Sequence, residues 1–233
     1  GATPAKCHSR FIRARARTID GMVQRRDRVK ARAMSTAFRI QRVALVGIEP
    51  PHSWSFPDRV TVIVGDSGGG KTTLLNLINF ALGAKVQIPD VVTEAARAVS
   101  LDARLGGAEL TLTREFRRNQ IHVVRDSEEV GNFSTQSGQS RPWISKFLLD
   151  LLEIPSIRVP KSRTGSSHQL SSLSFQDLFA YCFLDQDQVD RSTVFSEDKF
   201  REPKRRWAFE LLHGIVNEES ARVLAEREET AEA

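Results

Sequence analysis

Residues 65–72, GDSGGGKT, have the types and spacing of a loop that binds phosphate groups. Phosphate oxygens need several N–H donors at once, which only a tightly curled backbone supplies, and glycines permit that curl. The segment matches the pattern G-x-x-x-x-G-K-[S/T], in which the lysine reaches the β- and γ-phosphates and the hydroxyl ligates Mg²⁺. We therefore expect ATP and Mg²⁺ as cofactors. The expected nucleotide contacts are Gly65, Asp66, Ser67, Gly68, Gly69, Gly70, Lys71, Thr72 and Thr73.

The residues on either side of this loop predict the elements that would position it. The β-branched run RVTVIVG (59–65) predicts a strand that leads into the loop. The apolar spacing of TTLLNLINFALG (72–83) predicts a helix that ends at Gly83. Such a helix would direct the positive end of its dipole at the phosphates. A Gly-rich turn with a solvated lysine is the alternative interpretation.

The rest of the chain predicts an α/β fold with an antiparallel β layer. FRIQRVALVGI (38–48) predicts an earlier strand. In residues 97–126, apolar and polar residues alternate with period two and the alternating runs are connected by short turns, which predicts an antiparallel meander. Pro142 opens an amphipathic helix, and Ser174 is a candidate N-cap of the next one. After Pro203 the pattern is helical to the last residue.

Composition and charge exclude several classes of protein. Residues 1–33 hold ten Lys or Arg residues against two acidic ones, whereas the other 200 residues hold 24 against 27. We interpret residues 1–33 as a basic, disordered tail before a natural start at Met34, and the body is not a basic nucleic-acid binder. No apolar run could span a bilayer, which predicts no membrane partner. Two cysteines suit a reducing cytosol. We expect a cytoplasmic protein, in the prokaryotic cytosol or associated with the nucleoid.

The segment VTVIVGDSGGGKTTLLNLINFALG resembles the Walker A segment of SMC-type coiled-coil ATPases, including the SbcC-like double-strand-break repair proteins. The N-terminal half of their ATPase head has a similar order of elements. In this chain that order is FRIQRVALVGIE, a turn, VTVIVG, the phosphate loop, a helix and the meander. CFLDQDQVD (182–190) resembles their Q-loop, and by that match Gln186 would contact Mg²⁺ and the attacking water. Asp66-Ser67 and Asp187 depart from the usual family residues, which indicates a divergent branch.

The resemblance implies an ABC-type P-loop NTPase head lobe at 34–216 and the start of a coiled coil at 217–233. Lys71 and Gln186 would be catalytic, and Thr72 and Gln186 would face the metal. The sequence has no LSGG-type signature and no convincing Walker B strand. The implied partners are therefore the C-terminal half of the same protein, a second head engaged through ATP in a homodimer, and DNA. The implied function is ATP hydrolysis in that dimer, acting in DNA repair, chromosome maintenance or defence against foreign DNA, with the fragment alone inactive.

Two alternatives stay open. FAYCFLD ends in Asp185 as a Walker B strand does, which would make the chain a complete P-loop NTPase or kinase, although the preceding spacing is more helical and favours Gln186. A nucleotide-dependent assembly module without hydrolysis is the other. Arg114, in LTLTREF, falls where the resemblance places an arginine that couples nucleotide to DNA. A strand charge that faces solvent is an equal alternative for Arg114.

Overall fold

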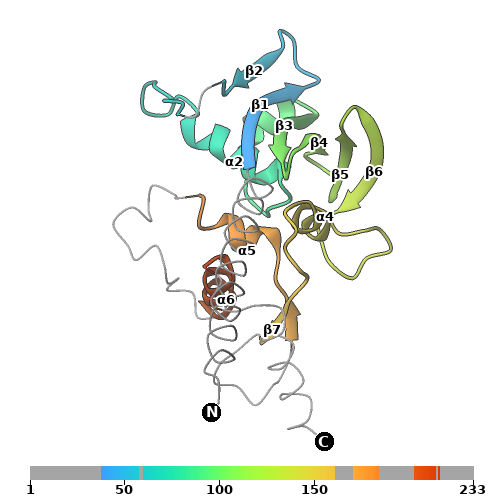
Figure 1. Cartoon of the computed structure of the whole chain (residues 1–233). Helices are drawn as coiled ribbons and strands as arrows, with labels where there is room; N and C mark the ends of the chain where they lie inside the picture. Colours follow the sequence, from blue (N-terminus) through green and yellow to red (C-terminus); the bar gives the residue numbers. More distant parts are fainter. Residues whose placement is uncertain (1–37, 58–59, 161–169, 184–201, 214, 216–233) are drawn as a thin grey trace, which may run out of the picture.

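The computed structural model describes residues 38–57, 60–160, 170–183, 202–213 and 215 (Figure 1). Its largest element is a six-stranded antiparallel sheet, in the order β2-β1-β3-β4-β5-β6. Consecutive strands from β3 onward are neighbours, so the predicted meander is confirmed, and it continues through one more strand. The strands of this sheet are β1 (Phe38–Val46), β2 (His52–Ser55), β3 (Ala98–Leu105), β4 (Ala108–Glu115), β5 (Gln120–Arg125) and β6 (Glu128–Ser134).

Alternation of apolar and polar residues gives this sheet one buried face. The turn between β3 and β4 is Gly106-Gly107, and both residues have positive φ, as a tight hairpin between twisted strands requires. Because side chains alternate across a strand, the register sends every second residue of β3, β4 and β5 into the core. The buried set includes Leu101, Ala103, Leu105, Leu110, Leu112, Ile121 and Val123.

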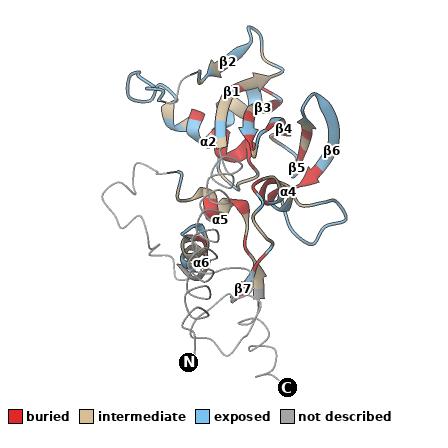
Figure 2. Cartoon of the chain, in the orientation of Figure 1, coloured by how far each residue is buried: buried red, intermediate tan, exposed pale blue. Residues whose placement is uncertain are grey.

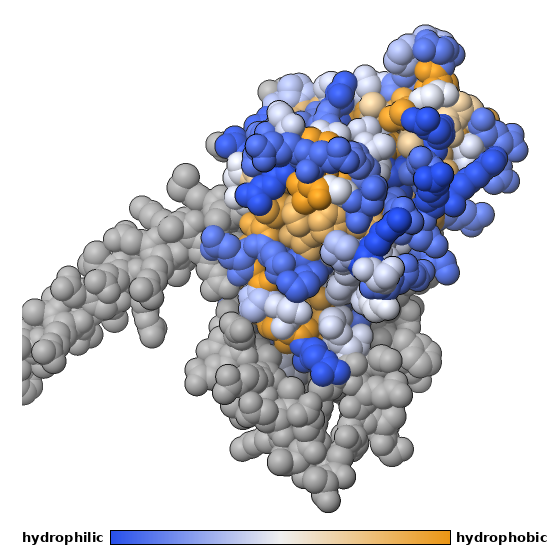
Figure 3. Space-filling model, turned by 90° about the vertical axis from the view of Figure 1, so that its right-hand side faces the viewer, coloured by the Kyte–Doolittle hydropathy of each residue, from blue (hydrophilic) through white to orange (hydrophobic). Residues whose placement is uncertain are grey.

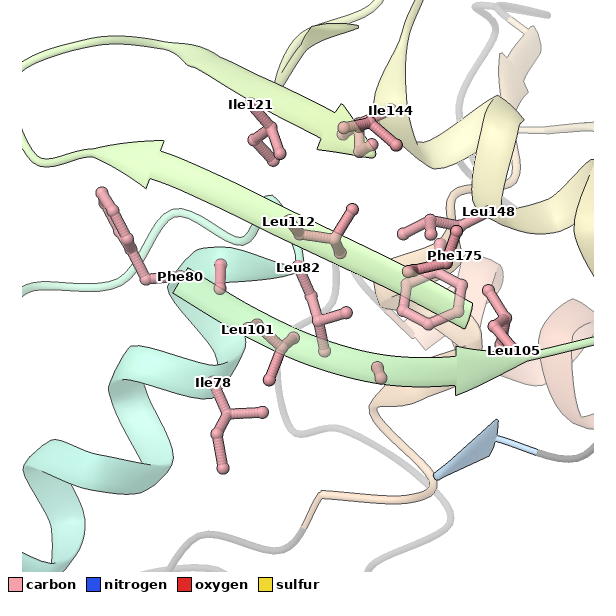
Figure 4. Packing of buried hydrophobic residues seen from close by; sticks show 14 of the residues in the cluster. Ile78, Phe80, Leu82, Leu101, Leu105, Leu112, Ile121, Ile144, Leu148 and Phe175 are labelled. Atoms are coloured by element: carbon pink, nitrogen blue, oxygen red, sulfur yellow. The ribbon is translucent and has the colours of Figure 1, made fainter. Parts of the chain in front are cut away.

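Helices cover the buried face of the sheet. Figure 2 shows buried residues gathered where α2, α4 and α5 meet the strands. Figure 4 shows Ile78, Phe80 and Leu82, from the end of α2, in the same buried cluster as Leu101 and Leu112 of the sheet. The helices are α2 (Lys71–Ala81), α3 (Asp90–Ala95), α4 (Ile144–Leu151), α5 (Phe175–Phe179) and α6 (Glu202–Leu212), and a second, two-stranded sheet pairs β7 (Arg158–Pro160) with β8 (Leu170–Ser172).

The face seen in Figure 3 is mostly hydrophilic, with apolar side chains exposed between the hydrophilic ones. Within the part of the chain that the structure describes, no helix is long and apolar enough to cross a bilayer. The predicted basic tail (1–33) and the predicted start of a coiled coil (217–233) lie outside the described residues.

Candidate nucleotide-binding site

The phosphate-loop residues lie together in an exposed turn at the N-terminal end of α2. Gly69 N–H donates to Asp66 O at 3.1 Å, which curls the loop. Gly70 has φ +83°, a conformation that other residues rarely adopt, and it directly precedes the first helical residue, Lys71. The structure thus places the predicted contact residues in one loop and the first turn of one helix.

The N-terminal end of α2 has the features of an anion site. Gly70 provides no side chain to cap the helix, and the first turn holds no acidic residue. The first backbone N–H groups of a helix have no partner within it, and the helix dipole makes this end positive. Both effects favour a phosphate group in front of α2.

Lys71 is folded over the loop that it follows. Its Nζ donates to Gly65 O and Asp66 O, each at 2.7 Å, which holds the ammonium group beside the phosphate loop. The Thr72 side chain is exposed, and that of Thr73 is half-buried. A glycine-rich loop at a helix N-terminus, a cation at its edge and an accessible hydroxyl fit a triphosphate with Mg²⁺, in which Lys71 would contact the phosphates and Thr72 the metal.

The segment that leads into the loop differs from the prediction. Residues 60–65 form no strand, although RVTVIVG predicts one. Val60, Val62 and Val64 are 79%, 78% and 87% exposed, and Ile63 is 37% exposed. A strand needs a neighbour to accept its hydrogen bonds, and no described strand pairs with this segment. The prediction of a strand is therefore wrong for these residues in this chain, because β propensity alone does not supply the partner.

The other end of α2 is closed as predicted. Gly83, with φ +97°, follows the last turn, Gly83 N–H donates to Phe80 O, and Ala84 N–H donates to Asn79 O. These are the two hydrogen bonds of a Schellman motif, which satisfies carbonyl groups that a helix end leaves without partners. The prediction that the helix ends at Gly83 is confirmed.

Arg114 joins this end of α2 to the sheet. Its side chain, on β4, is 5% exposed, and its Nη1 donates to Phe80 O at 2.7 Å and to Ala84 O at 2.9 Å. The guanidinium lies 3.7 Å from the centroid of the Phe80 ring. Burial lowers the pKa of Arg114 to about 10. The alternative of a solvent-facing charge is therefore wrong, and the residue lies at the end of α2 away from the phosphate loop.

The sequence pattern contained a signal for this buried arginine. Leu110, Leu112 and Arg114 occupy alternate positions on β4 and so share its inward face. A cation at an inward position must find acceptors, because burial without partners is costly. Its acceptors lie about 30 residues earlier in the chain. Spacing alone could not identify them.

The predicted Q-loop region is described only at its start. Cys182 is exposed, and partial burial raises the pKa of its thiol. Asp185 and Gln186 lie outside the described residues. Both assignments of the metal-facing residue therefore stay predictions.

A family model described as AAA domain matches residues 51–232, which is well over half of the chain. The protein belongs to this family of AAA-type P-loop ATPase domains, which is found in SMC/SbcC-like proteins. Membership supports a P-loop NTPase fold and nucleotide binding, in agreement with the loop before α2. No curated protein matches the chain.

Proposed function

We propose that this chain is the ATP-binding N-terminal lobe of an SMC/SbcC-like ATPase, in which ATP-driven engagement of two heads acts on DNA. The observation that carries the proposal is the glycine loop at the uncapped end of α2, with the Lys71 ammonium group hydrogen-bonded across it. Family membership and the resemblance of residues 38–216 to the first half of such a head support it.

The residues of the loop would bind ATP without large rearrangement. Backbone N–H groups of Gly68, Gly70 and the first turn of α2 would donate to phosphate oxygens. Lys71 would exchange its carbonyl partners for the β- and γ-phosphates, and Thr72 would hold Mg²⁺. The metal, when bound, neutralises charge that develops on the phosphate oxygens during transfer.

The exposed segment before the loop supports a second lobe as partner. Val60, Val62, Ile63 and Val64 expose apolar side chains in a row, and contiguous apolar surface marks places where proteins bind one another. Their backbone is not hydrogen-bonded to any described strand, so it can accept another strand. We propose that the C-terminal half of the same protein covers it, and that two such heads join through ATP to act on DNA in the cytoplasm.

Hydrolysis would then need Gln186 of this chain together with groups from the C-terminal half. Gln186 would orient the attacking water, while the signature motif and the Walker B carboxylates would come from the C-terminal half. Loss of one such transition-state donor typically lowers the rate on the order of 100–1,000-fold. DNA repair, chromosome maintenance and defence against foreign DNA are the roles that this architecture suits.

Steady-state phosphate release tests the proposal. We expect negligible turnover by the purified chain, restored turnover when the C-terminal half is added, and none with Lys71→Ala in either case. Lys146→Ala is the matched control, because Lys146 is exposed on α4 and pairs with Asp150 of the same helix. Robust turnover by the chain alone, abolished by Lys71→Ala, would instead indicate a complete NTPase that uses Asp185. Tight ATP binding without turnover in any mixture would indicate an assembly module.

A further inference from the structure

Side chains from two different elements bind the carbonyl groups at the C-terminal end of α2. Arg114, on β4, donates to Phe80 O and Ala84 O. Gln176, on α5, donates from Nε2 to Leu82 O at 2.6 Å. The phosphate-loop helix is therefore anchored to the sheet by one residue and to α5 by the other.

Gly83 permits the close contact with α5. A Cβ atom at this position would lie 3.2 Å from Gln176 Nε2 and 3.0 Å from Ile144 Cγ2, both closer than ordinary van der Waals contact. The Gln176 amide thus occupies space that any other residue at 83 would require. The hydrogen bond to Leu82 O depends on the last turn of α2 having its observed conformation.

The start of α5 is held by several contacts of its own. Ser174 and Asp177 form a reciprocal capping box, and Phe175 N–H donates to the buried Ser145 Oγ on α4. The Phe175 ring is 3% exposed and stacks at 5.7 Å on the Phe179 ring. With only five residues, α5 is too short to be stable alone, so its stability depends on these contacts and on α2.

We propose that Gln176 is a positioning residue that couples α5 to the nucleotide state of the phosphate loop. The inference rests on the proposed function, because the ligand is the triphosphate bound before α2. The N-terminal N–H groups of α2 lack a side-chain cap, so bound phosphate supplies the missing partners. Helix formation is cooperative, and a ligand at one end therefore stabilises the last turn at the other.

The consequence is that nucleotide makes local opening of α5 rarer. The bond between Gln176 and Leu82 O exists only while the last turn of α2 is formed, so stabilising that turn also stabilises α5. Arg114 keeps the same turn packed on the sheet and is the second positioning residue. The chain continues from α5 directly into the segment that holds Asp185 and Gln186.

Amide hydrogen exchange of the whole chain tests the coupling, with and without a non-hydrolysable ATP analogue and Mg²⁺. We expect the analogue to slow exchange at residues 175–183 about 5-fold or more in the unmodified protein. Gln176→Leu should remove this slowing at 175–183 while the analogue still slows exchange at the phosphate loop. Gln41→Leu is the matched control, since Gln41 binds Glu109 away from α2, and it should keep the slowing.

A second variant tests whether the amide donor of Gln176 is the group that matters. Gln176→Glu keeps the length of the side chain, but its carboxylate cannot donate at neutral pH, so it should behave as Gln176→Leu does. Slowing that persists at 175–183 in both variants would overturn the coupling through Gln176. An analogue that binds the unmodified protein without slowing exchange there would overturn the coupling alone. Failure of the analogue to bind would overturn the proposed function and the coupling with it.

Discussion

At its N-terminal end, α2 follows exposed glycines and has no side-chain cap, whereas its C-terminal end is buried and its carbonyl groups are hydrogen-bonded. The first end offers backbone N–H groups to a ligand. At the second end, Gly83, Arg114 and Gln176 satisfy carbonyl groups from within the chain. The two ends of the helix therefore have different roles. Backbone N–H groups without partners at the N-terminal end can bind a ligand, whereas carbonyl groups whose hydrogen bonds are satisfied at the C-terminal end fix the helix to the rest of the protein.

Lys71→Ala tests the functional end and should have the largest effect. We expect triphosphate affinity to fall about 10–150-fold, the worth of a charged hydrogen bond of about 1.5–3 kcal/mol. Thermal stability without nucleotide should change by less than about 0.5 kcal/mol, because Lys71 binds only carbonyl groups of its own exposed loop in the contacts described. Titration with a fluorescent ATP analogue and a thermal melt measure the two quantities.

Equal affinities of Lys71→Ala and the unmodified protein would contradict the assignment of the nucleotide site. A large loss of stability in Lys71→Ala would instead contradict the difference between the two ends of α2, because the N-terminal end would then also stabilise the fold. Lys146→Ala, on α4, controls for the loss of a surface cation.

Arg114→Met tests the anchored end and should show the reverse pattern. The change leaves the half-buried Ala84 O without its donor and removes one of two donors from the buried Phe80 O. We expect a loss of about 1–3 kcal/mol in the free energy of unfolding and a fall of about 2–10 °C in Tm. Arg104→Met is the control, because Arg104 is exposed on β3 and pairs with Glu109. A loss in Arg104→Met as large as in Arg114→Met would contradict the anchor.

The pH dependence of this loss follows from the lowered pKa of Arg114. With a pKa of about 10 in the folded chain, the guanidinium stays charged at pH 6–9, so the difference between Arg114→Met and the unmodified protein should be constant there. Above pH 10 the unfolded chain binds the proton more tightly than the folded chain does. The unmodified protein should therefore gain stability relative to Arg114→Met as the pH rises above about 10. Chemical denaturation across pH 6–9 checks the constant part.

Local patterns predicted the parts of the molecule that depend on neighbours in sequence. The phosphate loop, the end of α2 at Gly83 and the N-cap at Ser174 each follow from a few adjacent residues, and the structure has all three. The meander follows from period-two alternation, because one buried face fixes the register.

Features that depend on distant partners could not be predicted in the same way. RVTVIVG has the composition of a strand, but pairing is decided by a neighbouring strand that is absent from the described residues. Gln176 and its acceptor Leu82 O are 94 residues apart, and nothing in the spacing connects them. The metal-facing residue stays a prediction because Asp185 and Gln186 lie outside the described part.

Substitutions in residues 60–64, before the phosphate loop, should have the smallest effect on the stability of the chain. Threonine has nearly the shape of valine but carries a hydroxyl in place of a methyl group. The cost of a Val→Thr substitution therefore measures whether the position is buried away from water. Val62 and Val64 are 78% and 87% exposed, and Val62→Thr with Val64→Thr should change the stability of the chain alone by less than about 0.5 kcal/mol. Val123→Thr, at a position on β5 that is 0% exposed, should cost about 1–3 kcal/mol, because the hydroxyl would be buried without a designated partner.

The same pair of exposed substitutions should matter once a partner lobe is added. If the C-terminal half covers residues 60–64, the hydroxyls become buried in the interface, and the affinity of the two halves should fall although neither half is destabilised. Titration of the C-terminal half against the doubly substituted chain measures this directly. Unchanged affinity would mean that the partner binds elsewhere. A loss of stability in the chain alone as large as that of Val123→Thr would mean that residues 60–64 are covered within this chain. The difference between the exposed N-terminal end and the buried C-terminal end of α2 would then no longer hold.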